Sequence, residues 1–257
     1  MRKSVVSFLF SLLSLEGIEM NAVNRRRFLK LGIASAVLAG LGAVSGYFLL
    51  RRPGPASVAR RLPPGQYEVQ ALEVLHEGGV PRIGLDEWAF DVNGEVENPL
   101  KLDWSQFMQL PITASVSEFD CVTGWTKFDN RWEGVRFREI AKLARPTVKA
   151  KYATIECYGT ITYTTYTTSL PLDYLMRDDV LFAYNLDGKP LAPEHGGPLR
   201  LVVPGKYAYK SAKWVRQVRF TEKQELGFWE SLGYSNTADP WTDDRYASPH
   251  VAKNEPT

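Results

Sequence analysis

The stretch FDCVTGWTKFDNRWEGVRF, residues 119–137, carries one of only two cysteines in a chain of 257 residues. Cys121 stands between acidic residues and a Thr-Gly-Trp sequence that is typical of a turn. A second stretch, APEHGGPLRLVVPGKYAYKSAKWV at residues 192–215, combines paired glycines, basic residues and an apolar run. These two stretches are the most distinctive of the sequence, and Cys121 raises the question of which chemistry requires a thiol at this position.

Length and composition indicate one globular domain with a non-globular end. The chain is 44% apolar and 12% aromatic, which is enough to bury a substantial core. Its formal net charge is only +2, from 31 basic and 29 acidic residues, so no strong field attracts nucleic acid. We therefore expect no nucleic-acid partner.

The N-terminal region has the features of an export signal. Residues 24–30, NRRRFLK, match the twin-arginine pattern, and an uncharged apolar run follows at residues 31–50. At about 1.5 Å rise per residue this run reaches roughly 30 Å, enough to cross a bilayer, so a buried core helix is the weaker alternative. Because basic residues precede the run, we expect the domain outside the cytoplasm, with residues 31–50 kept as an anchor or cleaved.

This pattern predicts a partner, a location and a cofactor. Twin-arginine export machinery carries folded proteins, and the usual reason is a cofactor that is inserted in the cytoplasm. We therefore expect a periplasmic or extracytoplasmic protein with a bound cofactor. Residues 1–52 are the expected signal or membrane segment, with Met20 as an alternative start; residues 53–65 are a linker, residues 66–235 the domain and residues 236–257 an irregular tail.

Within the domain the sequence predicts short strands and short helices, with strands in the majority. Residues 87–96, EWAFDVNGEV, alternate apolar and polar side chains, and Asn93-Gly94 is a typical hairpin turn. Residues 137–144, FREIAKLA, have apolar residues at helical spacing and end just before Pro146. Further helices are expected near residues 103–110 and 170–179, and further strands at residues 151–170 (a pair), 180–186, 198–205 and 213–220.

The two cysteines allow two interpretations. In an exported chain a disulfide between Cys121 and Cys157 would stabilise the fold by about 4 kcal/mol in the chain-entropy model. The alternative is a metal ligand. The histidines, His76, His195 and His250, are scattered without metal spacing, which argues against zinc. A lone thiolate suits a metal whose other ligands come from an organic cofactor, and the residues alone leave both interpretations open.

Together, residues 119–137 and 192–215 resemble the molybdopterin-binding oxidoreductase domain of the sulfite oxidase superfamily. The chain is similar to bacterial sulfite oxidase-like proteins and to the catalytic subunit of the periplasmic methionine sulfoxide reductase, over roughly residues 66–235. The resemblance implies an α+β fold of mainly mixed β-sheets with short helices. It also implies molybdopterin with one molybdenum, for which Cys121 is the single protein ligand and the catalytic residue.

The resemblance further assigns contacts to the phosphate and pterin of the cofactor. Arg200 and Lys213 match the family's cationic contacts, although taken alone they would be ordinary surface charges. An anionic cofactor favours such residues, because charge-assisted hydrogen bonds are stronger than neutral ones. Ser211 and Ala212 would offer backbone amides beside them.

Three further residues are assigned by resemblance. His195 matches the sulfite oxidase branch, whereas the sulfoxide reductase branch has Asn there. His76 resembles the N-terminal histidine that contacts the pterin. Cys157 stands where relatives often carry a Thr that faces the cofactor, and a buried inert thiol is the alternative. We also considered four residues as the lining of an anion pocket: Arg131, Arg136, Lys206 and Tyr207.

The implied activity is two-electron oxygen-atom transfer at molybdenum on a small-molecule substrate, an oxyanion or a sulfoxide. The sequence has no C-x-x-C-H haem motif and no flavin or nicotinamide fingerprint, so we expect a separate electron carrier, a cytochrome. Because the immunoglobulin-like dimerisation domain of longer sulfite oxidases is missing, we expect a monomer. The alternative function is an exported, membrane-anchored binding module with the same fold and no redox turnover.

Overall fold

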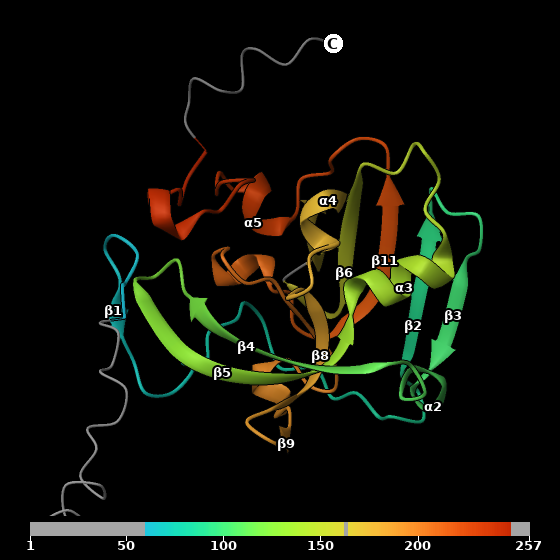
Figure 1. Ribbon diagram of the computed structural model, residues 1–257, viewed down its shortest axis with the longest axis horizontal. Helices are drawn as coiled ribbons and strands as arrows, with labels where there is room; N and C mark the ends of the chain where they lie inside the picture. Colours follow the sequence, from blue (N-terminus) through green and yellow to red (C-terminus); the bar gives the residue numbers. More distant parts are fainter. Residues whose placement is uncertain (1–59, 162–163, 248–257) are drawn as a thin grey trace, which may run out of the picture. The chain divides into compact units, whose positions relative to one another are not determined.

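The computed structural model describes residues 60–161 and 164–247, and of these the residues from Arg61 to residue 247 belong to one compact unit (Figure 1). The predicted signal and anchor within residues 1–52, and His250, lie outside the described residues. Among residues 60–161 and 164–247, no helix is long and apolar enough to cross a membrane.

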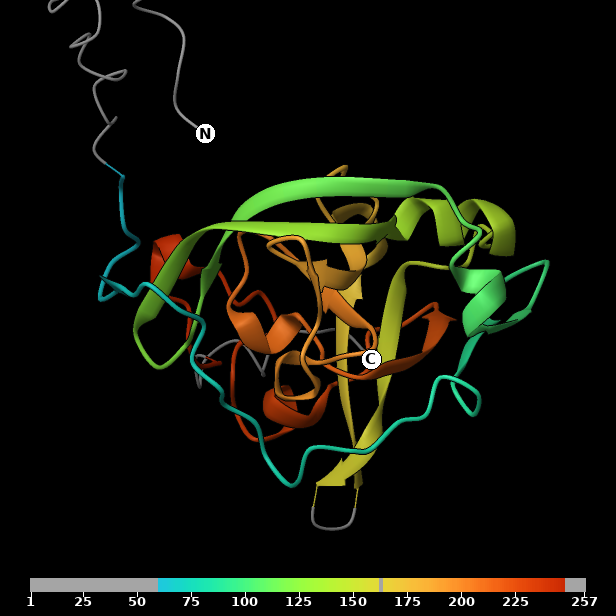
Figure 2. The same ribbon diagram turned by 90° about the horizontal axis from the view of Figure 1, so that it is seen from below.

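The first sheet has the order β1-β5-β8-β10, with β4 paired to β5 and β9 paired to β8. Its longest part is the hairpin of β4 (Ile112–Asp120) and β5 (Trp125–Arg136), which Figure 2 shows as a curved ribbon along one side of the domain. The other strands are β1 (Tyr67–Glu68), β8 (Leu181–Leu186), β9 (Lys189–Pro190) and β10 (Arg200–Val202). β1 runs parallel to β5, and the remaining pairs are antiparallel.

The second sheet has the order β3-β2-β11-β6-β7. Its strands are β2 (Ala89–Gly94), β3 (Leu100–Asp103), β6 (Tyr152–Ile161), β7 (Thr164–Pro171) and β11 (Val215–Thr221). β11 is parallel to β2 and antiparallel to β6. Both sheets are therefore mixed, as the resemblance implies.

The helices are short, and their ends follow local sequence rules. Those of the α type are α2 (Trp104–Phe107), α3 (Phe137–Ala144), α4 (Leu172–Leu175) and α5 (Phe228–Ser231). Asp103 caps α2, because its carboxylate accepts a hydrogen bond from the Gln106 amide at 2.8 Å. α3 has the bounds that its sequence predicts, and it ends where Arg145 adopts the left-handed conformation before Pro146. Three 3₁₀ helices complete the set: η1 (Pro193–His195), η2 (Ala208–Lys210) and η3 (Pro240–Thr242).

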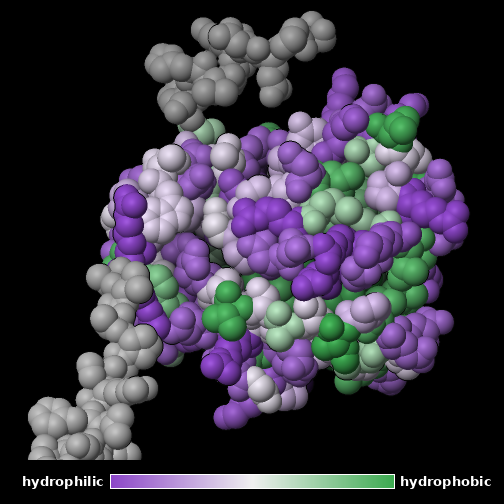
Figure 3. All heavy atoms as spheres, in the orientation of Figure 1, coloured by the Kyte–Doolittle hydropathy of each residue, from purple (hydrophilic) through white to green (hydrophobic). Residues whose placement is uncertain are grey.

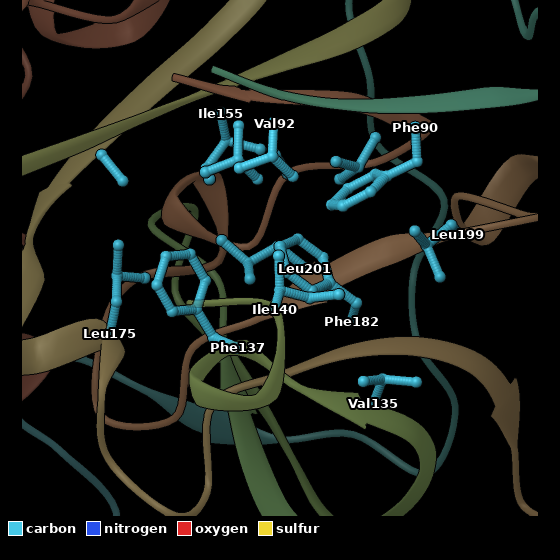
Figure 4. Close-up of a cluster of buried hydrophobic side chains, with 14 of the residues drawn as sticks. Phe90, Val92, Val135, Phe137, Ile140, Ile155, Leu175, Phe182, Leu199 and Leu201 are labelled. Carbon is cyan, nitrogen blue, oxygen red and sulfur yellow. The ribbon is translucent and has the colours of Figure 1, made fainter. Parts of the chain in front are cut away.

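Helix α3 links the two sheets through a cluster of buried hydrophobic side chains (Figure 4). The ring of Phe137 lies 5.7 Å from that of Phe182 on β8 and 5.9 Å from that of Phe220 on β11. Phe182 in turn lies 5.2 Å from Phe90 on β2. These contacts bury large apolar surfaces between elements of both sheets, which fixes the sheets against each other.

The tight hairpin predicted at Asn93-Gly94 is wrong. The antiparallel partner of β2 is β3, which starts only at Leu100. Gly94 instead continues the pairing with β11, opposite Phe220, and its φ of +85° and the close backbone of Phe220 both require glycine. The Asn-Gly signal therefore marks a close approach of two strands.

Other elements are shorter than predicted. The strand expected at residues 213–220 starts at Val215, because Trp214 has a φ of +54°. The strand expected at residues 198–205 is reduced to β10, and the helix expected at residues 170–179 is α4. Residues 236–247, expected as part of an irregular tail, contain η3 and pair Tyr234 with Tyr246 in an isolated bridge.

On the face shown in Figure 3, apolar residues lie in small groups among hydrophilic ones. Single exposed apolar residues are normal on the surface of a folded domain. The surface shown therefore has no large apolar patch that would indicate a docking site by itself.

Candidate active site

A pocket of about 340 Å³ opens in the part of the domain where the Cys121 turn meets the 192–215 segment. Residues 72–79, part of the extended cyan segment in Figures 1 and 2, close one side of it. Residues 229 and 234, from the C-terminal segment, close another. The lining contains all the residues that the sequence assigned to the site except Cys157: His76, Cys121, His195, Arg200, Ser211, Ala212 and Lys213.

Cys121 lies in the turn between β4 and β5. Its amide donates a hydrogen bond to the Trp125 carbonyl at 2.8 Å, and the Gly124 amide donates to the Cys121 carbonyl at 3.0 Å. Gly124 has a φ of +114°, which only glycine adopts readily, so the Thr-Gly-Trp sequence sets the turn. The turn presents the Cys121 side chain to the pocket while keeping 93% of the residue's surface covered, since only 7% is exposed.

The electrostatics of the Cys121 thiol depend mainly on burial. Burial raises the pKa of Cys121, and the hydrogen bond from the Thr123 hydroxyl to Sγ at 3.1 Å opposes that rise. The described protein groups alone therefore favour a neutral thiol. A cation bound at Sγ would reverse the balance, because a metal-coordinated thiol is deprotonated.

Arg200 on β10 is buried, with only 2% of its surface exposed, and it lines the pocket. Nη1 donates to the His195 carbonyl and Nη2 to the Ser211 carbonyl, both at 2.9 Å. The guanidinium carbon also lies 4.8 Å from the Phe119 ring centroid and 5.3 Å from that of Trp132. Burial lowers the pKa of Arg200 to about 10, so the group stays charged at neutral pH. Among the described residues no carboxylate forms an ion pair with it, and its charge is available to an anion in the pocket.

Lys213 and His195 add to this positive wall. Lys213 Nζ donates to the carbonyls of Glu194 at 2.6 Å and Leu75 at 3.0 Å. Burial, and then repulsion by Arg200, lower the pKa of Lys213 to about 8. Burial lowers the pKa of His195 as well, with smaller contributions from Lys213 and Arg200. An anion in the pocket would relieve this mutual repulsion, so the wall is suited to a negatively charged ligand.

Three further predicted residues, His76, Ser211 and Ala212, line the pocket but differ in exposure and in hydrogen bonding. His76 is exposed beside the pocket, with its ring 5.7 Å from that of Trp214. The Ser211 amide already donates to the Ala208 carbonyl at 3.0 Å, so it does not offer a free donor as predicted. Its hydroxyl accepts from the Val203 amide at 3.0 Å. The Ala212 carbonyl accepts from the Leu201 amide at 2.8 Å.

Cys157 on β6 lies in the main hydrophobic cluster and is fully buried. Both cysteines are free thiols, so the alternative of a Cys121–Cys157 disulfide is wrong. Burial strongly raises the pKa of Cys157. The structure thus agrees with the alternative of a buried inert thiol, since Cys157 is not part of the pocket lining.

None of the four residues considered for an anion pocket lines this pocket. Arg136 Nε, for example, donates to the Asp178 carbonyl at 3.1 Å, and Lys206 Nζ lies 4.6 Å from the Tyr174 ring. The sequence reasoning instead missed an aromatic part of the wall formed by Tyr209, Trp229 and Tyr234. For Trp229 and Tyr234 the sequence signal is the density of aromatic residues in GFWESLGY, residues 227–234, whereas Tyr209 lies within the 192–215 stretch.

The thiol, the positive wall and the other polar groups of the lining show which kind of ligand the pocket fits. The thiol and the positive wall line the same cavity, as a metal with an anionic organic ligand requires. In residues 60–161 and 164–247 no group of three or more His, Cys, Asp or Glu residues could hold a metal without further ligands. Trp125 also lines the pocket, and its buried Nε1 has no hydrogen-bond partner in the described protein. A single thiol beside a positive wall would suit a metal that takes its other ligands from an anionic organic group.

Comparison with known proteins places the chain among oxidoreductases that bind molybdopterin. Residues 77–229 match the oxidoreductase molybdopterin binding domain. The chain is 40% identical over 187 residues to the uncharacterized oxidoreductase YuiH of Bacillus subtilis, covering 72% of this chain and 92% of that protein. It is 29% identical over 232 residues to the protein-methionine-sulfoxide reductase catalytic subunit MsrP of Campylobacter jejuni, covering 82% and 77% of the two chains.

A solved structure is also similar. The sulfane dehydrogenase SoxCD from Paracoccus pantotrophus matches with a TM-score of 0.53 and 25% identity, over 58% of this chain and 41% of that chain. The family match covers more than half of the chain, and relatives with this domain are enzymes. The chain therefore belongs to the molybdopterin-binding oxidoreductases of the sulfite oxidase superfamily.

Proposed function

We propose that this protein is a molybdenum-cofactor oxidoreductase that exchanges an oxygen atom with an organic S-oxide and passes electrons to or from a separate redox protein. One observation carries the proposal: the Cys121 thiol shares a single pocket with the positive wall of Arg200, Lys213 and His195. A soft ligand and a fixed positive wall are the two features that a metal-bearing anionic pterin requires.

Cys121 would bind the molybdenum, and Arg200 and Lys213 would hold the anionic part of the cofactor. The bound molybdenum centre supplies two-electron oxygen-atom exchange. Thr123 would stabilise the thiolate of Cys121, since its hydroxyl already donates to Sγ. The buried guanidinium of Arg200 is held by two carbonyls and needs no rearrangement to present its charge, so the site is preorganised.

The aromatic part of the wall favours an organic substrate. The rings of Trp229 and Tyr234 lie 5.1 Å apart, and those of Tyr209 and Tyr234 lie 5.5 Å apart. Aromatic faces bind thioether and alkyl groups well, whereas a small oxyanion gains little from them. Among the described lining residues the only Arg and Lys are Arg200 and Lys213, which the cofactor would engage. The relative MsrP is, by its name, a methionine sulfoxide reductase, which supports the same substrate class.

Oxidation of a sulfite-like anion is the second candidate. It is favoured by His195, which matches the sulfite oxidase branch and belongs to the positive wall. A binding module without turnover is the third, and it predicts no bound molybdenum. For all three, we propose export by the twin-arginine machinery to the periplasm, with residues 31–50 as an anchor if they are kept. For the two enzyme candidates, we also propose a monomer with a cytochrome as its electron partner.

The test combines metal analysis with paired assays. Protein from a molybdenum-replete host should carry about one molybdenum per chain, and it should turn over dimethyl sulfoxide or methionine sulfoxide with a reduced artificial carrier faster than it oxidises sulfite with ferricyanide. Trp229→Leu should raise KM for methionine sulfoxide by about tenfold while leaving molybdenum content unchanged. Faster turnover of sulfite would favour the second candidate, and protein without molybdenum would favour the binding module.

A further inference from the structure

Two residues outside the family-matched segment 77–229 hold the turn that carries Cys121. Gln66 Nε2 donates to the Cys121 carbonyl at 3.1 Å. From the other end of the chain, Arg245 Nη1 donates to the carbonyl of Val122, the residue directly after Cys121. The turn is thus fixed at two successive carbonyls by side chains that the family match does not include.

Arg245 is itself held in place by two neighbours. Its Nε donates to Asp243 Oδ1 at 2.7 Å, and its guanidinium carbon lies 5.4 Å from the Tyr207 ring centroid. The Tyr207 hydroxyl donates to the same Asp243 oxygen at 3.1 Å, which closes the set of three residues. Because the planar guanidinium is already oriented, little rotamer freedom remains to be lost when it binds the turn.

The same set also reaches the strand before the turn. Tyr207 pairs with Asp120 in an isolated parallel bridge, and Asp120 directly precedes Cys121. Arg245 and Tyr207 therefore contact the backbone on both sides of Cys121. A charge-assisted hydrogen bond to Val122 is stronger than the neutral contacts within the turn, so its loss should loosen the turn before the rest of the domain.

We infer that Arg245 is a positioning residue for Cys121: it fixes the 121–125 turn, and through it the direction in which the thiol enters the pocket. The importance of this direction for turnover rests on the proposed function, in which Cys121 binds the metal. A ligand that is misplaced by a fraction of an ångström weakens catalysis without abolishing binding.

The first measurement does not depend on the metal. Hydrogen exchange of the Cys121 and Gly124 amides, which bond within the turn, should be about tenfold faster in Arg245→Gln than in the wild type. Arg245→Lys, which keeps a donor but loses the planar fork, should give a smaller increase. Arg177→Gln is the matched control, because the exposed Arg177 pairs with Asp179 and does not line the pocket; it should leave the turn unchanged.

The second measurement uses the molybdenum-loaded protein. Arg245→Gln should shift the sulfur-to-metal absorption and lower kcat by about tenfold, with KM nearly unchanged, because substrate contacts are kept. Unchanged exchange at the turn, or a uniform increase throughout the domain, would overturn the inference. A wild type without molybdenum would contradict the proposed function, while a local increase in exchange would still support positioning of the turn.

Discussion

The guanidinium carbon of Arg200 lies 4.8 Å from the ring centroid of Phe119, two residues before Cys121 in the same hairpin. Arg200 belongs to β10 and Phe119 to β4, so this contact joins strands that are not neighbours in the sheet. Arg200 thus has a structural role, through the ring and the carbonyls it binds, in addition to the charge it presents to the pocket. A substitution of Arg200 should therefore affect both the stability of the fold and the binding of an anion in the pocket.

Arg200→Ala should therefore lower stability as well as cofactor content. Its removal leaves the partly buried carbonyl of His195 and the buried carbonyl of Ser211 without their donor, which should cost about 3 kcal/mol of the free energy of unfolding. From the sequence we expect a further loss of about 2 to 4 kcal/mol in cofactor affinity. Urea unfolding and molybdenum analysis of the same preparations measure the two effects. Full molybdenum content with wild-type stability would exclude both roles.

Substitution of the two cysteines by serine should give opposite results. Cys121→Ser should abolish turnover and the sulfur-to-metal absorption, with little change in the free energy of unfolding, because the side chain faces the pocket. Cys157→Ser should retain activity but destabilise the fold by about 1 to 3 kcal/mol, since it buries a hydroxyl in an apolar cluster. Activity assays and urea unfolding of both variants measure turnover and stability separately. Retained turnover in Cys121→Ser would refute the metal-ligand assignment.

Lys213 predicts a pH dependence of stability with a defined sign. Its pKa is about 8 in the folded protein and about 10.5 unfolded, so between these values the unfolded chain binds more protons. Stability should therefore rise with pH in this window, by less than about 1.4 kcal/mol per pH unit because the group is partly solvated. Urea unfolding of cofactor-free wild type and Lys213→Met at pH 7, 8 and 9 isolates the contribution of Lys213. Bound cofactor should flatten the difference; a difference that falls with pH would contradict the assigned pKa shift.

The sequence predicted most of the regular elements because their signals are local. The apolar spacing in residues 137–144 gives α3 its bounds, and the Thr- and Tyr-rich residues 151–170 form the expected pair β6 and β7. The Asn93-Gly94 prediction failed because the same Gly residue that suits a tight turn also suits close packing against β11. That packing partner lies more than a hundred residues away and has no local signature.

In the site, too, local motifs predicted some residues, whereas contacts between distant segments were not predicted. Motif residues such as Cys121, Arg200 and Lys213 meet in one pocket, whereas the amide of Ser211 is used within the protein. Trp229, Tyr234 and Arg245 lie outside any recognised motif, and only the fold of the C-terminal segment brings them to the Cys121 turn. Contacts between distant segments depend on the packing of the whole domain, which sequence patterns do not specify.

The export prediction concerns residues outside the described structure. Replacement of Arg25 and Arg26 by Lys should retain a folded, cofactor-loaded protein in the cytoplasm, because the twin-arginine machinery recognises the arginine pair. Cell fractionation with molybdenum analysis of each fraction measures the outcome. If the variant still reaches the periplasm, Arg27 or another pathway is sufficient, and the inference of a folded, loaded cargo loses its support.

A buried ion pair connects the segment before Ser211 to the aromatic part of the pocket wall. Lys210, next to Ser211, pairs with Glu230, next to Trp229, and both side chains are fully buried. Lys210 Nζ also donates to the Ser169 carbonyl at 3.1 Å, and the Thr168 hydroxyl donates to Glu230 Oε1 at 2.7 Å. The pair therefore ties η2 and α5 to β7.

Glu230→Gln should destabilise the fold by about 3 to 5 kcal/mol, because it leaves the Lys210 ammonium buried without a counter-charge. The double variant Lys210→Met, Glu230→Gln should be more stable than Glu230→Gln alone, since no unpaired charge remains. Urea unfolding of the wild type, both single variants and the double variant gives the coupling energy. If the single effects add in the double variant, the two side chains are not coupled, and α5 must be held by its other contacts.

If the two side chains are coupled, Glu230→Gln should also raise KM for an organic S-oxide, because Trp229 would lose its fixed position in the pocket wall.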